Sequence, residues 1–206
     1  MTSILKVDNI QKANGSVPTA GDLGINTAGS VLQVKQTIFK DQFANSVTTN
    51  GHEEVVTGLN CAITPSSASN KILVQYTVHT GAQSFYGVGL KLYRNVTANT
   101  GAGPLGTELV DAAGNNIEGN GLGGRPATTG MLSLLGSSDV NVNAPASGTL
   151  LDHPNSTNAL TYSFAFKFYN FSGTSIYVNR THNFQVNAAG YDPTPVSAIT
   201  LMEIAG

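Results

Sequence analysis

Hydrophobic and polar residues alternate along most of the chain beyond residue 30. The clearest example is the run 160–169, where Tyr162, Phe164, Phe166 and Phe168 fall at every second position. Alternation with a period of two is the pattern of a β-strand that buries one face. The run therefore predicts a strand whose aromatic face belongs to a core.

Other segments have the same strand-like character and are separated by clusters of turn residues. They are residues 31–39, 54–57, 59–64, 71–79, 85–94, 175–179 and 196–204. Within the fifth of these, Val88, Leu90 and Leu92 fall on one face and Lys91 and Tyr93 on the other. This series of short strands predicts an all-β fold, an antiparallel β-sandwich that is jelly-roll-like.

Two long stretches between the predicted strands lack this alternation. Residues 95–130 are rich in Gly, Asn, Thr and Ala, and residues 136–158 are rich in Asn, Ser, Pro and Gly. Loops of this length are uncommon in a compact domain unless they bind something or are packed by a neighbour. We therefore expect both to face outward or toward neighbouring subunits. The loop residues expected to contact a receptor or a neighbour are Asn115, Asn116, Asn120, Arg125 and Asn155.

The start of the chain has strand-like apolar positions at Ile4, Leu5, Val7 and Ile10, followed by a run of turn residues. A segment this short cannot bury its own apolar side chains. Order here would require a partner surface, either another copy of the chain or a larger assembly. We interpret these four side chains as the anchors of a docking segment.

The chain thus divides into two predicted parts. Its 206 residues suit one β-rich domain with an extension. Residues 1–30 form the extended N-terminal docking segment in this interpretation, and residues 31–206 form the β-sandwich. The alternative is that residues 1–30 are a loosely attached first strand of the main domain.

The composition favours association between copies of the chain. Charged residues make up only 11% of the sequence, against a usual share of about 25%. Low charge leaves little repulsion between copies, and the net charge of −2 without a basic cluster predicts no binding to nucleic acid. Cys61 is the single cysteine, so an intrachain disulfide is excluded. We expect a homo-oligomer, most of all a homotrimer.

The sequence carries no pattern for export or membrane insertion. The N-terminus lacks a positive region followed by a long apolar stretch, so we predict no signal peptide. No apolar run approaches the roughly 20 residues that a membrane-spanning helix needs. A composition typical of extracellular or assembled β-proteins, without an export signal, fits a virion component made in the host cytoplasm and released by lysis.

None of the catalytic, cofactor or metal motifs in the sequence is complete. Residues 119–124 match GxGxxG, but Arg125 and a proline follow where a helix should begin. His52 opens a zinc-protease pattern that lacks its second histidine, and no GxSxG motif occurs. We predict no enzymatic activity, no cofactor and no metal. A glycan hydrolase built on two carboxylates and a cation bound over residues 111–118 stay open as alternatives.

Five short segments carry a resemblance to a known group of proteins. Residues 3–11 read Ser-Ile-Leu-Lys-Val-Asp-Asn-Ile-Gln, 21–24 read Gly-Asp-Leu-Gly, and 29–34 read Gly-Ser-Val-Leu-Gln-Val. Residues 63–74 read Ile-Thr-Pro-Ser-Ser-Ala-Ser-Asn-Lys-Ile-Leu-Val, and 199–206 read Ile-Thr-Leu-Met-Glu-Ile-Ala-Gly. Together they resemble short tail-fibre-like or capsid-decorating structural proteins of marine bacteriophages.

The resemblance implies a virion appendage, often homotrimeric, with an N-terminal attachment segment, a distal β-domain and other virion structural proteins as partners. The chain lacks a long repetitive shaft, so it would be a short fibre or knob that displays its sandwich for host attachment. One alternative is a capsid decoration (cement) protein. Another is a carbohydrate-binding β-sandwich module whose long loops hold a host surface glycan.

Overall fold

The computed structural model describes most of the chain. The described residues are 9–18, 22–23, 28–47, 49, 51–82, 88–117, 130–131, 143–168, 174–183 and 194–206. Within them the regular structure is all β-strand, with no helix. The strands are β1 (Val31–Phe39), β2 (Phe43–Val47), β3 (His52–Ile63), β4 (Lys71–Ala82), β5 (Val88–Arg94), β6 (Thr100–Ala102), β7 (Thr107–Glu108), β8 (Gly130–Met131), β9 (Asn143–Asp152), β10 (Leu160–Phe168), β11 (Thr174–Val178) and β12 (Ser197–Ile204).

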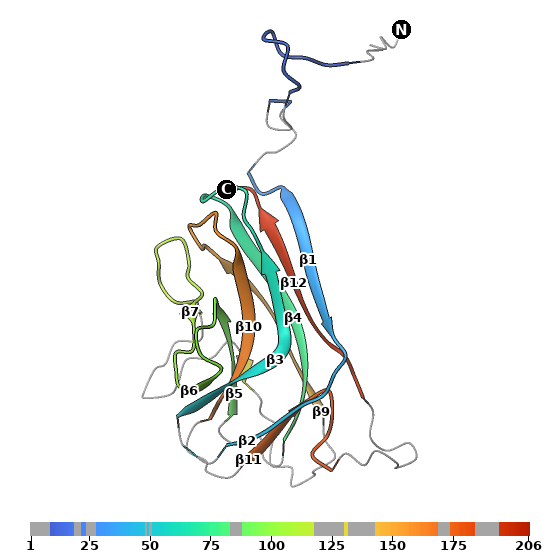
Figure 1. Cartoon of the computed structure of the whole chain (residues 1–206), viewed down its shortest axis with the longest axis vertical. Coiled ribbons are helices and arrows are strands. Elements are labelled where there is room, and N and C mark those ends of the chain that lie inside the picture. The colour runs from blue at the N-terminus through green and yellow to red at the C-terminus, as the bar shows by residue number, and fades with distance from the viewer. Residues whose placement is uncertain are drawn as a thin grey trace.

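These strands form two antiparallel sheets that face each other (Figure 1). The terminal sheet, named for the first and last strands, has the order β1-β12-β4-β9, and β11 and β2 extend it from the end of β4. The aromatic sheet, named for β10, has the order β6-β3-β10-β5, with β7 and β8 on the free edge of β5. The chain crosses between the sheets after β2, β3, β4, β8, β9 and β10. The orders β1-β12-β4-β9 and β3-β10-β5-β8 are those of a jelly roll, so the predicted sandwich is confirmed.

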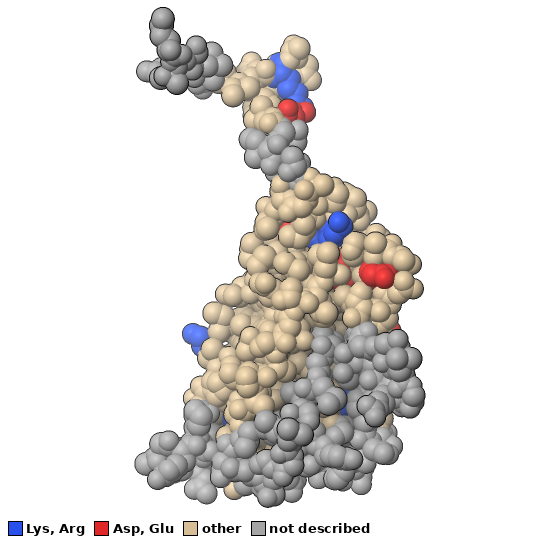
Figure 2. All heavy atoms as spheres, turned by 180° about the vertical axis from the view of Figure 1, so that it is seen from behind, with Lys and Arg blue, Asp and Glu red and all other residues tan. Residues whose placement is uncertain are grey.

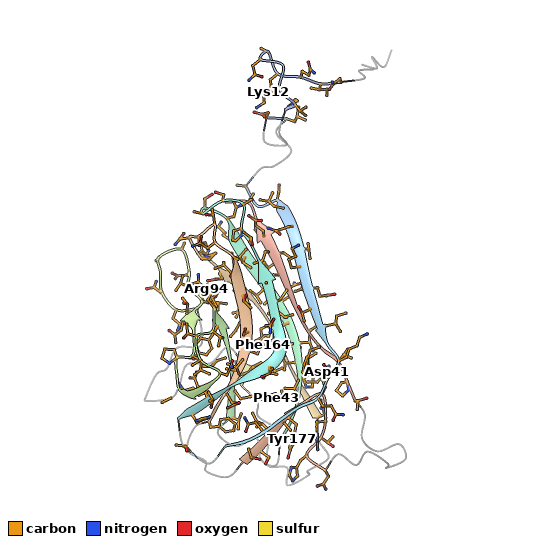
Figure 3. All side chains as sticks on the ribbon, in the orientation of Figure 1. Lys12, Asp41, Phe43, Arg94, Phe164 and Tyr177 are labelled. Atoms are coloured by element: carbon orange, nitrogen blue, oxygen red, sulfur yellow. The ribbon has the colours of Figure 1, made fainter. Side chains whose placement is uncertain are left out.

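The core lies between the two sheets and is built on the aromatic face of β10. Tyr162, Phe164, Phe166 and Phe168 are all fully buried, as their alternation predicts. The Phe164 ring packs on Tyr76 of the opposite sheet with their centroids 5.0 Å apart. Figure 3 shows Phe164 in the middle of the sandwich.

The strand β3 is continuous where the sequence predicts two strands, because a bulge accommodates Gly58. This residue has φ of +90°, and a Cβ there would lie 2.8 Å from the Phe39 ring. The register of β3 with β10 shifts between Ser163 and Ala165. A β-bulge of this kind lets a glycine interrupt the alternation without ending the strand.

The prediction of one long loop over 136–158 is wrong for its central part. Residues 143–152 form β9, which pairs along ten residues of β4. The stretch contains Pro145 and Gly148 and has no β-branched apolar residue, so its composition resembles a loop. Its pairing to a central strand, which the local sequence does not record, makes it a strand.

Both termini of the sandwich lie at one end, here called the near end. Beyond β1 and β12, the amide of Gly29 donates to the carbonyl of Ala205, and the amide of Ala205 donates to the carbonyl of Ser30, both at 2.9 Å. The antiparallel order also places the connections after β3, β5 and β9 at the near end. Residues 9–18 lie beyond it, apart from the sandwich (Figure 1).

Candidate functional site

Of the four anchors predicted in the docking segment, Ile10 lies among the described residues. Ile10 is 51% exposed and Val17 is 73% exposed. The predicted anchors Ile4, Leu5 and Val7 lie outside the described residues. The segment therefore presents apolar side chains that the sandwich does not bury.

The segment is organised by its own local contacts. The amide of Lys12 donates to the carbonyl of Ser16, and the amide of Gly15 donates to the carbonyl of Lys12, each at 2.8 Å. The Asn14 side chain accepts from the Ser16 hydroxyl at 2.7 Å, and Lys12 forms an ion pair with Asp22. Gly15, with φ of +80°, supplies the left-handed turn that closes this hairpin-like bend.

The two predicted loop regions meet at the near end through a buried network. Asp152 Oδ2 lies 3.2 Å from Arg94 Nε and accepts from the Tyr162 hydroxyl at 2.6 Å. Arg94 also donates to the carbonyls of Glu108 and Pro154. Burial and the Asp152 charge raise the pKa of Tyr162, so its hydroxyl stays a proton donor. The network fixes both loops to the ends of β5, β9 and β10.

The predicted loop residues fall into two groups. Asn115 and Asn116 are exposed and hydrogen-bond to Asp111 and Glu108 respectively, and Asn155 is exposed with φ of +47°. The hydrogen bonds from Asn115 lower the pKa of Asp111. The other two residues, Asn120 and Arg125, lie outside the described residues.

These three asparagines lie at the near end, on the same side of the molecule as the docking segment. The amide of His153 donates to the carbonyl of Val110 at 2.9 Å, which joins the two loops. The Asp111 side chain is held by hydrogen bonds within its own loop. No group of three or more His, Cys, Asp or Glu residues in the described chain is placed to hold a metal ion. In the same residues no helix could cross a membrane.

The outward side of the terminal sheet is a second candidate site, which the sequence did not reveal. Alternate residues of β1, β12, β4 and β9 point outward and line up across the strands in three rows. The apolar row is Val34, Met202, Leu73 and Leu151. The polar row is Gln36, Thr200, Gln75 and Thr149, and the mixed row is Ile38, Ala198, Thr77 and Ser147. We call these twelve residues the open face.

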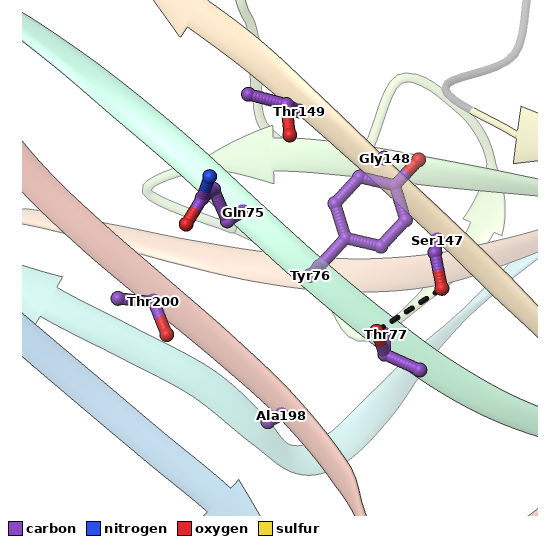
Figure 4. Close-up of a pocket in the computed structure, with 8 residues that line it drawn as sticks. All are labelled: Gln75, Tyr76, Thr77, Ser147, Gly148, Thr149, Ala198 and Thr200. Carbon is purple, nitrogen blue, oxygen red and sulfur yellow. Dashed lines mark hydrogen bonds between the residues drawn. The ribbon is translucent and has the colours of Figure 1, made fainter.

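The centre of the open face is hollowed (Figure 4). A hollow of about 420 Å³ lies over β4, β9 and β12. Ala198, one of the twelve outward residues, lines it with only a methyl group. Beneath it the Tyr76 hydroxyl approaches Gly148, and a Cβ at position 148 would lie 2.5 Å from that oxygen. The Ser147 hydroxyl donates to Thr77 at 3.0 Å across the strands.

The open face combines exposed apolar side chains with an absence of charge. None of its twelve residues is Asp, Glu, Lys or Arg. The view from behind, on the side where β9 lies, shows a broad surface with few charged side chains (Figure 2). In the described sandwich, the large apolar side chains that are exposed belong to this face or its margin. They are Val31, Val34, Ile38, Leu151 and Val196.

Comparisons with known proteins add little to this description. No family model matches the chain, and no curated protein matches it. One similar solved structure is the VP2 subviral particle of infectious bursal disease virus, a viral capsid protein, with a TM-score of 0.34 and 10% identity. The match covers 84% of this chain but only 38% of that one. At this level the likeness identifies neither a family nor a function.

The open face could not be predicted from the sequence for a specific reason. The outward residues of β4 and β12 in the three rows alternate with buried ones and carry no charge, which is a readable signal. The fourth strand, β9, falls within the loop that the sequence predicts over residues 136–158. Without it, Ser147 and Thr149 could not be placed beside Thr77 and Gln75.

Proposed function

We propose that the protein is a structural subunit of a bacteriophage virion, a short fibre or knob that docks through residues 1–30. The observation that carries the proposal is the exposure of Ile10 and Val17 on a segment that lies apart from a sandwich with a complete core of its own. Apolar side chains on such a segment become stabilising only when a partner buries them. The resemblance of residues 3–11 to phage fibre proteins supports the same function.

The arrangement of the loops refines this proposal. The near end carries Asn115, Asn116 and Asn155. Docking through residues 1–30 makes this end face the rest of the particle. We therefore assign these asparagines to contacts with neighbouring virion proteins, and we assign host attachment to the opposite end of the sandwich. A capsid-decorating protein would have the same orientation, and gold labelling of assembled particles would distinguish the two locations.

A carbohydrate-binding module is the weaker candidate. Sugar-binding sites commonly stack a ring against an aromatic side chain. Residues 95–117 and 153–159, the described parts of the loops at the near end, contain no Phe, Tyr or Trp. We also propose that the protein has no enzymatic turnover, for which blank assays on polysaccharides and peptidoglycan are the test.

Incorporation into particles tests the docking function. Deletion of residues 1–30 should leave a soluble, folded sandwich, because β1 and its partners keep their own core, and the truncated protein should be missing from assembled particles. The milder pair Val7→Asp with Ile10→Asp should have the same effect, since a buried charge without a partner is costly. Asn60→Ala, at an exposed residue of β3, serves as a control that leaves both the docking segment and the near-end asparagines intact. Normal copy number of the truncated protein, measured by mass spectrometry of particles, would contradict the proposal.

A further inference from the structure

We infer that the open face is the surface through which copies of this chain associate, each turning it toward a common axis. The face contains the twelve outward residues of β1, β12, β4 and β9 defined above. It joins exposed apolar side chains to a central hollow, and it lacks charge. The inference rests on the proposed function in one respect only: docking at one end requires the copies to point the same way.

The distribution of exposed apolar residues singles out this face. Val34 is 54% exposed, Ile38 is 52% and Leu151 is 40%, and all three stand on two edge strands of one sheet. On the aromatic sheet the corresponding outward side chains, such as Tyr93 and Ala165, are buried. A contiguous exposed apolar patch on one side of a soluble domain marks an interaction surface.

The chemistry of the face selects a second copy of this chain as the partner. An uncharged surface has no electrostatic complement in nucleic acid or in a highly charged protein. The amide of Gln75 and the hydroxyls of Thr200 and Thr149 each donate and accept hydrogen bonds, so the same groups can pair with one another across an axis. Like charges, which would oppose contact between identical faces, are missing from it.

The shape and size of the face allow contact between copies. The hollow over β4, β9 and β12 is lined by uncharged residues, so an uncharged side chain of another copy can enter it. Four strands about 4.8 Å apart and three rows about 6.6 Å apart give roughly 400 Å² of flat area for the twelve residues of one copy. A contact between two copies then buries about 800 Å², the size of a small interface.

The edges of the terminal sheet point to the same arrangement. Natural proteins protect edge strands with charges, prolines or covering segments. The two edge strands carry exposed Lys35 in β1 and exposed Pro145 in β9, so pairing of edges between copies is disfavoured and association is left to the face. Residues 9–18 and the near-end loops lie beyond the strand ends rather than over this face (Figure 1).

Sedimentation of the full-length protein at micromolar concentration is the test. The wild type should sediment as one oligomer. Gln75→Lys with Thr200→Lys places two charges on adjacent residues of the polar row, and association should weaken by about 100-fold or more because identical faces then repel. The matched control is Asn60→Lys with Ala62→Lys, two exposed strand residues of the aromatic sheet, and it should sediment like the wild type.

Chemical cross-linking gives a second readout that does not depend on the charge substitutions. Thr200→Cys should be joined to another copy by a short bis-maleimide, whereas Asn60→Cys should not. The native Cys61 is 4% exposed and should not react in the folded protein. Circular dichroism checks that every variant is folded.

The outcomes separate this inference from the proposed function. A monomeric wild type, or a folded Gln75→Lys/Thr200→Lys variant that keeps the wild-type mass, would overturn the inference. Loss of binding on a glycan array without a change in mass would reassign the face to a sugar ligand and would also overturn it. An oligomer that depends on the open face but never enters particles would support the inference while contradicting the proposed function.

Discussion

The outer side of one sheet is covered by the chain itself, whereas the outer side of the other is exposed. The aromatic sheet is covered by the chain's own residues 95–108: Leu105 and Val96 pack on Tyr93, Val55 and Ala165. The terminal sheet has no such cover among the described residues, and its outward side chains remain exposed. Both sheets carry apolar residues on their outer sides. Residues 95–108, which follow β5, cover those of the aromatic sheet, and no described segment covers those of the terminal sheet. The face left uncovered is the one that we expect another copy to bury.

The aromatic sheet carries buried charge beneath its cover, whereas the open face carries none. Glu53 is fully buried, its Oε1 lies 2.8 Å from Lys167 Nζ, and Tyr93 donates its hydroxyl to Oε2 at 2.5 Å. The backbone at Gly103 lies so close that any side chain there would collide with the Glu53 carboxylate. A buried ion pair of this kind fixes one arrangement of a covering segment, and removal of one partner is costly.

The largest expected effect follows from breaking this ion pair. Glu53→Ala should lower the free energy of unfolding by about 3 kcal/mol or more, because Lys167 and the Tyr93 hydroxyl lose their partner under the cover. Chemical denaturation measures it. Glu54→Ala is the matched control. In the part of the chain that the structure describes, the ion pair of Glu54 is with His52 at 3.4 Å, so its loss should cost less than about 1 kcal/mol. Equal effects would show that the buried pair does not hold the cover.

A pair of leucine substitutions sharpens the comparison. Leu105→Ala removes a side chain that is 3% exposed and should cost about 2–3 kcal/mol of stability. Leu151→Ala removes one that is 40% exposed, so the monomer should lose less than about 1 kcal/mol. The order reverses for association: Leu151→Ala should weaken the oligomer and Leu105→Ala should not. Denaturation ranks the two variants by loss of stability, and sedimentation ranks them by loss of association. If the same variant had the larger effect in both measurements, the cover and the open face would not differ in role.

A smaller, pH-dependent effect is expected at Glu203, which lies on the inward side of the terminal sheet close to the near end. Burial alone would raise the pKa of this carboxyl, but hydrogen bonds from Gln33, Asn70 and Ser66 outweigh it and hold the pKa below its usual value. A lowered folded-state pKa contributes stability that is complete above the ordinary glutamate pKa of about 4.3 and is lost as the pH falls through the folded value.

Glu203→Gln should therefore destabilise the protein by about 1–2 kcal/mol at pH 7. The difference between wild type and variant should shrink as the pH falls below about 4.3. Thermal unfolding from pH 7 to pH 2 measures it, with Glu108→Gln as the comparison because Glu108 is partly exposed and its pair with Lys91 spans 3.3 Å. A constant difference across this range would mean that the carboxylate charge does not matter.

The sequence predicted the sandwich because its evidence was local. The alternation around Phe164 and along β1, β4 and β12 needs only neighbouring residues, and each of those strands forms as expected. The strand β9 and the network of Arg94, Asp152 and Tyr162 could not be predicted, since they depend on pairings between residues far apart in the chain. The open face belongs to this second class. Its rows exist only once four strands are placed side by side.

The smallest expected effect on stability, and the sharpest contrast with the open face, concerns the docking segment. Ile10 is 51% exposed on a segment beyond the near end, so Ile10→Asp should change the free energy of unfolding by less than about 0.5 kcal/mol and should leave the oligomer intact. Its effect should appear only in assembly, where the charge would have to enter an apolar docking site. Ile38→Asp, on the open face, should do the reverse and weaken the oligomer directly. Denaturation, sedimentation and mass spectrometry of particles applied to both variants separate the roles. If Ile10→Asp dissociates the oligomer, the segment belongs to the subunit interface and is not a separate docking element.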